Sequence, residues 1–433
     1  MNTSSASAAR ASSTITHMPW SFSLRPALRA ALILGGLAGC ASPLPPEAPA
    51  SEPPTGAPVG SPPAASGQPP APQGAPVTTA PGPAPAMMAF GISRWVAAPW
   101  NELPGWPQDN VLAAWPALLK SCERPAPGWQ DACAEARSVA EPDEAKVRAW
   151  LTAHLQPWRV ESPEGQAEGM ITGYYEPLIE ASRSARPGFT VPLYGPPADL
   201  ATRKPWFTRE QVERDPAARS GLRGREIAFV ADPLDALVLH IQGSGRLAVT
   251  EPDGQRRLVR AAFAGHNDQP YKSVGRWLVD RGAFTLEQAS WPAIKSWARA
   301  HPRRVEEMLN ANPRYVFFRE EPLIDPSAGP RGAQGVALTP GRSIAVDKRS
   351  VPYGSPVWID TTEPQPWSAA NPPPPRPLQR LVVAQDTGGA ITGPVRADYF
   401  WGWGDGAEAR AGRMKQPLRM WVLWPKVQTV GSR

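Results

Sequence analysis

The chain has 433 residues and carries 45 Lys and Arg against 39 Asp and Glu, a net charge of +6. These basic residues are scattered rather than gathered into one stripe, which argues against a nucleic-acid partner. The length is enough for two or three domains. Eighteen Trp accompany only 7 Tyr; indole faces suit sugar rings, although ordinary packing accounts for most of them.

The N-terminus has the features of a secretion signal. Arg25 and Arg29 precede an apolar run over residues 30–37, which ends in Leu37-Ala38-Gly39-Cys40. The run is too short to span a bilayer stably. The tetrapeptide resembles the bacterial lipobox, in which the Cys is acylated. We therefore predict a lipoprotein signal peptide over 1–39, with an ordinary signal peptide as the alternative. Because no Asp follows Cys40, the expected location is the outer membrane, facing the periplasm.

A Pro- and Ala-rich segment follows Cys40. Of the 56 prolines, 16 fall between Ser42 and Ala86, a stretch without Phe, Trp or Tyr. Such a segment cannot bury enough apolar surface to offset its ordering entropy. Residues 40–89 are therefore predicted to be an acylated Cys and a disordered linker, which in polyproline II could reach up to ~140 Å toward the cell wall.

The folded part is expected to begin with helices. Apolar residues at helical spacing predict five of them, with Pro116 as a candidate kink in the first: 111–119, 144–156, 273–280, 286–301 and 304–310. Cys122 and Cys133 are the remaining cysteines. In an oxidising periplasm we predict that they form a disulfide, with free buried thiols as the alternative.

Short apolar runs separated by Gly and Pro turns follow Pro313. They predict the strands of a small barrel or sandwich: 315–318, 336–338, 343–346, 357–359, 381–384 and 420–423. A second β-rich stretch is predicted from Met170 to Val249, including strands over 227–230 and 236–241.

Carboxylates are the expected acid–base groups. The five His show no zincin spacing, and no Gly-x-Ser-x-Gly elbow occurs. Asp386-Thr387-Gly388-Gly389 is similar to an aspartic-peptidase turn, but that chemistry needs two Asp and the chain has one such motif, which leaves only a homodimeric version. Asp398 lies among Tyr399, Phe400 and Trp401. Aromatic surroundings raise a carboxyl pKa by desolvation, as a general acid requires, whereas a solvated loop Asp is the alternative.

Two further segments could contact a sugar. Gly173-Tyr174-Tyr175-Glu176-Pro177 is typical of a turn that presents ring faces and hydroxyls. The predicted strand over 236–241 runs into Gln242-Gly243-Ser244-Gly245, where glycines let the backbone approach a ligand. Ordinary turn packing is the alternative for both.

Together these segments carry a resemblance to a known family. Five motifs occur in the order seen in membrane-bound lytic murein transglycosylase A: 173–177, 242–246, 312–318, 345–347 with 351–354, and 386–391. The chain resembles this family from about Trp95 to Trp424, and the lipobox fits it too. Segment 401–406 is richer in Trp than the family's pattern leads us to expect, which leaves its local contacts open.

The resemblance implies a mainly β fold with several helices. A six-stranded double-psi β-barrel domain would be interrupted by an inserted β-rich domain, with the substrate groove between them. Residues 90–175 would form the first, partly helical part of the barrel domain. Residues 176–313 would form the inserted substrate domain, and 314–433 the barrel itself.

The resemblance also implies site residues. Asp398 occupies the motif position of the catalytic acid, and Asp386 that of a second, supporting carboxylate, for which a turn cap is the alternative. Substrate contacts would come from the motif residues Tyr174, Tyr175, Glu176, Gln242, Gly243, Ser244, Gly388 and Gly389. Neither a metal nor an organic cofactor is required.

The reaction implied is cleavage of the β-1,4 bond between N-acetylmuramic acid and N-acetylglucosamine without water, leaving 1,6-anhydromuramic acid. The chain would then be a lyase, a peptidoglycan lytic exotransglycosylase of wall remodelling. Its partners would be glycan strands, outer-membrane lipid through acylated Cys40, and other wall-synthesis or lytic proteins. The rival interpretations are a hydrolytic muramidase, the aspartic peptidase above, and a non-catalytic peptidoglycan-binding lipoprotein.

Overall fold

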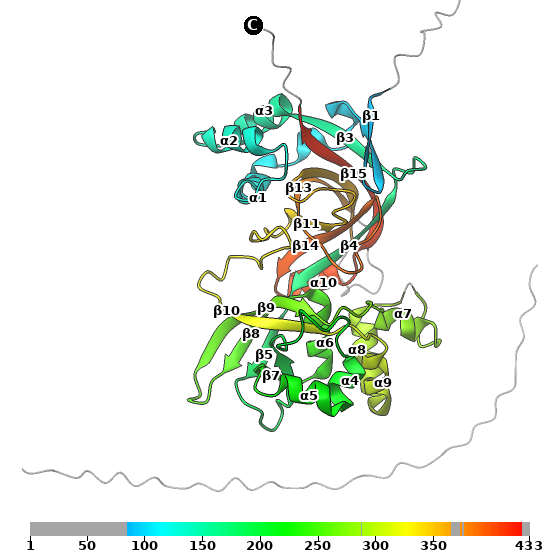
Figure 1. The fold of residues 1–433 in the computed structure, drawn as a ribbon. Coiled ribbons are helices and arrows are strands. Elements are labelled where there is room, and N and C mark those ends of the chain that lie inside the picture. The colour runs from blue at the N-terminus through cyan, green and yellow to red at the C-terminus, as the bar shows by residue number, and fades with distance from the viewer. Residues whose placement is uncertain (1–84, 287, 365–372, 375, 427–433) are drawn as a thin grey trace, which may run out of the picture. The chain divides into compact units, whose positions relative to one another are not determined.

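A computed structural model of the chain describes residues 85–286, 288–364, 373–374 and 376–426 (Figure 1). The predicted signal peptide, Cys40 and nearly all of the predicted linker lie outside these ranges. Within them, no helix is both long enough and apolar enough to cross a membrane.

The larger sheet has nine strands, and part of it closes on itself. In spatial order these are β1 (Met87–Phe90), β2 (Ser93–Ala97), β3 (Leu155–Glu161), β15 (Lys415–Pro425), β12 (Pro356–Glu363), β13 (Arg376–Asp386), β11 (Ser343–Val346), β14 (Arg396–Trp403) and β4 (Gly169–Glu176). β15 pairs with β4 as well as with β12, so the last six strands form a ring, visible in Figure 1. The predicted six-stranded barrel is confirmed.

The barrel is filled by alternate residues of its strands. Ile171, Val357, Ala397, Tyr399 and Met420 are completely buried in this core. Because successive strand residues point to opposite faces, the neighbours of Ala397 and Tyr399 on β14 face away from the barrel core. That alternation directs Asp398 outward.

Helices cover one side of the barrel. α1 (Trp115–Ser121), α2 (Gln130–Ser138) and α3 (Glu144–His154) pack with Trp358 and Trp421 in one apolar cluster. The predicted disulfide between Cys122 and Cys133 is present and joins the end of α1 to α2. Pro116 lies in the first turn of α1, where no helical N–H is needed, so it begins this helix rather than kinking it.

A second sheet of six strands forms the inserted region. Its order is β10 (Val316–Pro322), β9 (Arg256–His266), β8 (Gly245–Thr250), β5 (Leu178–Ser182), β7 (Glu226–Val230) and β6 (Val191–Tyr194). The structure differs here from the predicted boundary at 313/314. β10 pairs with β9 along its length, and Phe318 is buried in the core of this sheet, so this strand belongs to the insert and not to the barrel.

The prediction of a strand over 236–241 is wrong, because these residues lie in helix α6 (Pro233–Gln242). Asp232 caps the helix, Pro233 occupies its first turn, and Gly243 ends it at φ 80°. α6 is buried on two sides. Its Ala236 and Leu239 face the six-stranded sheet, whereas other residues of the helix pack on the next helical cluster. A continuous apolar run of this kind cannot be told from a buried strand by periodicity alone.

The remaining helices are short. Two precede β7, namely α4 (Arg209–Arg214) and α5 (Pro216–Leu222), and three form the cluster against α6: α7 (Val274–Val279), α8 (Trp291–Ala300) and α9 (Val305–Asn310). α10 (Asp405–Ala411) follows β14. The strand predicted over 336–338 is absent; this described segment has only an isolated bridge between Arg331 and Ala337, since a tight turn at Gly335 interrupts it.

Barrel and insert are joined through a buried ion pair at the end of β4. Glu176 has no exposed surface and accepts hydrogen bonds from Arg246 of β8 at 2.8 Å and from Arg260 of β9 at 2.5 Å. The two guanidinium groups also donate to the carbonyl oxygens of Pro326 and Ala328. One carboxylate thus faces two buried guanidinium groups and balances one of their two positive charges; the carbonyl oxygens supply the other acceptors.

We expect Glu176→Gln to lower the free energy of unfolding by about 3–5 kcal/mol, because it leaves two buried cations without an anion. Urea denaturation measures this change. Glu180→Gln is the matched control, since Glu180 follows on β5 and pairs with Arg256 at the exposed surface; its cost should stay under about 1 kcal/mol. Equal costs for the two variants would contradict a structural role for the buried pair.

Candidate active site

Strand β11 places the two predicted acids on either side of it. Ala345 is the register partner of Asp386 at the end of β13 and also of Asp398 on β14. Neighbouring strands lie about 4.8 Å apart, so the two Asp backbones are separated by roughly 10 Å. Both side chains are half-buried and can be reached from solvent.

Asp398 is held by a chain of two hydrogen bonds. Thr172 of β4 lies opposite Asp398 in the β4–β14 register, and its hydroxyl donates to Asp398 Oδ1 at 2.6 Å. Arg396 Nη2 donates to Thr172 Oγ1 at 2.9 Å. Because a guanidinium can only donate, the Thr172 oxygen accepts from Arg396 and keeps its own proton for the bond to Asp398. Oδ1 is therefore an acceptor, and a proton on this carboxyl group belongs on Oδ2.

Burial raises the pKa of Asp398 to about 6, and the negative charge of Asp386 acts in the same direction. The hydrogen bond from Thr172 and the positive charge of Arg396 oppose the rise. Desolvation prevails because it penalises the carboxylate directly. About half of the Asp398 side chains then carry a proton at pH 6, which suits a general acid.

Asp386 is occupied by more partners. Its Oδ2 accepts from the Tyr174 hydroxyl at 2.9 Å, and its Oδ1 accepts from the backbone N–H of Ala333 at 2.9 Å. Burial raises its pKa, while these bonds and one from the Thr387 backbone lower it. With both oxygens bonded, Asp386 is poorly placed to exchange a proton with a ligand. It is placed to supply a fixed negative charge.

Tyr174 links the two acids. Its ring packs at 5.1 Å from Phe400 of β14, and its hydroxyl reaches Asp386. Burial, with the charges of Asp386 and Asp398, raises its pKa well above the usual value, so the hydroxyl remains a donor.

Tyr175 and Glu176 do not have the surface positions that a sugar contact needs. The Tyr175 ring is 5% exposed and packs on Val238 and Ala407. Glu176 is completely buried in its ion pair with Arg246 and Arg260. The physical reason is strand alternation combined with the insert, which covers this end of β4. The predicted substrate contacts through these two side chains are therefore wrong.

The 242–244 segment lies at the end of α6. Gln242 Oε1 accepts from the backbone N–H of Tyr175 at 3.0 Å, which ties the helix to β4. Gly243 is the residue that ends α6, and Ser244 is half-buried beside it. The side-chain carbonyl of Gln242 is therefore engaged in a structural hydrogen bond, and its amide N–H groups remain for a ligand.

Gly388 and Gly389 lie in the turn that follows Asp386. Gly389 is exposed, and a Cβ atom there would stand 2.3 Å from Arg314 Nη1, so only glycine fits without displacing this side chain. Gly388 is half-buried against Ile391. The turn thus brings a cation from the insert close to the segment that carries Asp386.

Three further residues belong to this region although no motif indicated them. Thr172 and Arg396 contact or influence Asp398 directly, and Tyr271 is close enough for the Asp398 charge to raise its pKa, after the larger effect of burial. Arg396 could have been predicted from the sequence, because it precedes Asp398 by two positions on the same strand and therefore lies on the same face. Thr172 and Tyr271 depend on tertiary pairing.

One cavity lies elsewhere on the barrel. It has a volume of about 190 Å³ and contains neither acid; it is lined by Glu168, Asp360, Thr361, Thr362, Pro417, Leu418 and Arg419.

Comparisons with known proteins agree on one family. The model for the MltA specific insert domain matches residues 170–319, and the model for the 3D domain matches residues 342–424. Two curated relatives carry the name membrane-bound lytic murein transglycosylase A. The one from Vibrio cholerae is 31% identical over 60% of this chain and 66% of its own length, just under two thirds. The one from Escherichia coli is 30% identical over 64% of this chain and 74% of its own length.

Solved structures show the same likeness. The lytic transglycosylase LtgG of Burkholderia pseudomallei is 42% identical, with 79% of this chain and 98% of that chain covered and a TM-score of 0.52. E. coli MltA with bound chitohexaose is 25% identical, with 79% and 95% covered and a TM-score of 0.57. With the barrel, the insert and the two acids in place, the chain belongs to the family of membrane-bound lytic murein transglycosylase A.

Proposed function

We propose that this chain is a lytic transglycosylase that cleaves the β-1,4 bond between N-acetylmuramic acid and N-acetylglucosamine, with Asp398 as its single acid–base group. Family membership supports the reaction class, and the chitohexaose bound by the E. coli relative supports a glycan ligand. The observation that carries the assignment is the contrast between the acids. Asp398 has a raised pKa and one acceptor oxygen engaged, whereas both oxygens of Asp386 are engaged.

In the first step, Asp398 Oδ2 gives its proton to the glycosidic oxygen as the bond to C1 of the muramic acid breaks. The leaving sugar departs with a new hydroxyl, and positive charge develops at C1 and the ring oxygen. The negative charge of Asp386 stabilises this oxocarbenium-like centre, with the substrate's own N-acetyl group as a second source of stabilisation.

In the second step, the Asp398 carboxylate takes the proton from the C6 hydroxyl of the same muramic acid. O6 then bonds to C1 and closes the 1,6-anhydro ring. The proton balance closes on one residue, because Asp398 regains what it gave, and no water is consumed. A hydrolase instead has to activate water, usually with a second carboxylate. Both oxygens of Asp386 already accept a hydrogen bond, which makes it less suited than a free carboxylate to that task.

The protein would act on the wall from a lipid anchor. The relatives are named membrane-bound, and the lipobox at Cys40 is the feature of this chain that supports attachment. We propose acylation of Cys40, an outer-membrane location facing the periplasm, and glycan strands as the substrate. The Pro-rich segment up to residue 86 would provide the reach between membrane and wall.

Replacement of the acid tests the assignment directly. Asp398→Asn and Asp398→Ala should each lower release of soluble fragments from murein sacculi by at least about a hundredfold, because neither side chain can donate a proton. Mass spectrometry of the products of the active enzyme should give muropeptides one water lighter than lysozyme products. The melting temperature of Asp398→Asn should not fall, since Asn avoids the cost of a buried carboxylate.

Three results would contradict this assignment. A near-full rate for Asp398→Asn would remove Asp398 from the chemistry. Full-mass reducing products would make the chain a muramidase. Binding to sacculi without any soluble product would make it a wall-binding lipoprotein.

The pH dependence follows from the raised pKa of Asp398. Because the protonated form is needed, kcat/KM should be level below about pH 6 and fall above it, up to tenfold for each pH unit. Thr172→Val removes a bond that favours the carboxylate, so the pKa of Asp398 should rise and the falling limb should move to higher pH. If the falling limb of kcat/KM stays at the same pH in Thr172→Val, a group other than Asp398 controls the rate.

Asp386→Asn should weaken turnover without eliminating it, because it removes a stabilising charge but no transferred proton. It should also move the falling limb to lower pH, since the Asp386 charge raises the pKa of Asp398. The profile of kcat/KM against pH measures both effects. Complete inactivity with normal glycan binding would instead give Asp386 a direct chemical role.

A further inference from the structure

The guanidinium group of Arg314 lies beside the site without an anion. Its Nε donates to the carbonyl oxygen of Gln269 at 2.8 Å, and Nη1 faces Gly389. In the part of the chain that the structure describes, neither Nη1 nor Nη2 has a hydrogen-bond acceptor or a carboxylate at salt-bridge distance. The side chain is nevertheless half-buried.

Three of the five arginines that are buried in the described residues form ion pairs, whereas Arg209 and Arg396 are held by hydrogen bonds to uncharged partners. Arg246 and Arg260 share Glu176, and Arg342 pairs with Asp109 at 2.8 Å. Removing a guanidinium from water costs free energy unless an anion or several acceptors replace the lost hydration. Burial accordingly lowers the pKa of Arg314, and Asp268, beyond ion-pair distance, offsets only part of this. Nη1 and Nη2 of Arg314 are therefore two donor groups without a partner among the described residues.

Two buried amides hold Arg314 in place. Asn312, 2% exposed, accepts from the backbone N–H groups of both Arg314 and Lys272. Asn267, completely buried, donates to the carbonyl oxygen of Pro313 and accepts from the N–H of Tyr315. The backbone is thus fixed on both sides of Arg314. The side chain itself is held through the bond from Nε to Gln269, which reduces the conformational entropy that it loses when it binds a ligand.

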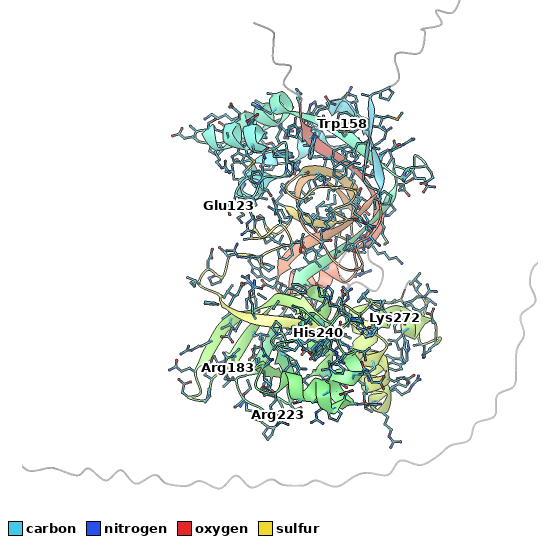
Figure 2. The ribbon with its side chains drawn as sticks, viewed as in Figure 1. Glu123, Trp158, Arg183, Arg223, His240 and Lys272 are labelled. Carbon is cyan, nitrogen blue, oxygen red and sulfur yellow. A yellow bond between two sulfur atoms is a disulfide. The ribbon has the colours of Figure 1, made fainter. Side chains whose placement is uncertain are left out.

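The position of Arg314 connects it to the acids. Gly389 follows Asp386 by three residues, and Tyr271, in the loop that Arg314 contacts through Gln269, responds to the charge of Asp398. Lys272 ends this loop (Figure 2) and adds a second cation. His266 cannot supply an anion, because an imidazole is either neutral or cationic; burial and the charge of Arg314 lower its pKa and so favour the neutral form.

We propose that Arg314 binds a carboxylate carried on the 3-O-lactyl substituent of a muramic acid residue. This inference rests on the proposed glycan substrate and makes it more specific. A planar guanidinium with two free nitrogens suits a carboxylate, which it can bind through two parallel hydrogen bonds. Murein carries such groups at this substituent, either as the lactyl carboxylate of peptide-free strands or as carboxylates of the stem peptide. Chitin oligosaccharides carry none.

The test measures binding in the full-length Asp398→Asn variant, so that turnover does not consume the probe. The probes are soluble murein glycan strands with stem peptides, the same strands after amidase treatment, and chitohexaose. Arg314→Gln should raise the Kd for at least one muramoyl probe by about tenfold, as expected for a lost charge-assisted bond. It should leave the Kd for chitohexaose unchanged. Arg223→Gln is the matched control, because Arg223 is exposed at the end of α5 (Figure 2).

The pattern across probes identifies the source of the carboxylate. A loss confined to peptide-bearing strands assigns it to the stem peptide, and a loss confined to amidase-treated strands assigns it to the lactyl group. Arg314→Lys keeps the positive charge but not the two parallel donor groups, so it should lower the affinity for the muramoyl probe by less than Arg314→Gln does. It also replaces Arg314→Gln in the test if that variant is unstable. Unchanged Kd values for both muramoyl probes, or an equal loss for chitohexaose, would overturn the proposal.

The binding test of Arg314 and the test of the proposed reaction can fail independently of each other. Release of anhydro products from sacculi is measured on the otherwise unmodified enzyme. If no products appear while Arg314→Gln still weakens muramoyl binding selectively, the carboxylate site stands and the transglycosylase assignment falls. If products appear and binding does not discriminate, the reverse holds.

Discussion

The pairing of β4 with β14 is the constraint on which the rest of the structure depends. It joins segments more than 220 residues apart in sequence and, with the β4–β15 pairing, closes the barrel. Three alternate residues on one face of β4 then have different tasks. Thr172 holds Asp398, Tyr174 holds Asp386, and Glu176 anchors the insert through Arg246 and Arg260. A shift of one residue in this register would turn all three side chains to the opposite face.

The two acids differ because of their neighbours and not because of their type. Both are half-buried aspartates flanking β11, and burial raises the pKa of each. Asp386 recovers part of the desolvation cost through backbone N–H groups and the Tyr174 hydroxyl. Among the described residues, Asp398 has one hydrogen-bond partner for its carboxyl group, Thr172, whose hydroxyl also accepts from Arg396. Asp398 is the less hydrogen-bonded of the two acids, and burial raises its pKa to about 6, which suits the proposed role as proton donor.

Much of the barrel could be predicted from sequence, because β-branched runs between Gly and Pro turns are local signals. The segments 343–346, 357–359, 381–384 and 420–423 all lie inside observed strands. The apolar run over 236–241 predicts a strand but forms part of α6, because this helix is buried on two sides. The sequence signal for a helix is Asp232-Pro233, which caps and begins it. Thr172 could not be found at all, because its role exists only once β4 and β14 are in register. Glu176 was misassigned for the same reason: its burial depends on arginines from two later strands.

The proposed acid–base group lies on a barrel strand, whereas the group proposed to recognise the glycan lies in a connecting segment. Asp398 and Thr172 lie within strands of a closed barrel, where hydrogen bonds on both sides fix their backbone. Gly389, Gln269 and Arg314 lie in connecting segments outside the strands of the ring. A proton transfer tolerates little displacement, whereas a charge contact tolerates more. Under the proposed function, the acid is fixed by the barrel, while the connecting segments carry the group proposed to recognise a substituent of the glycan.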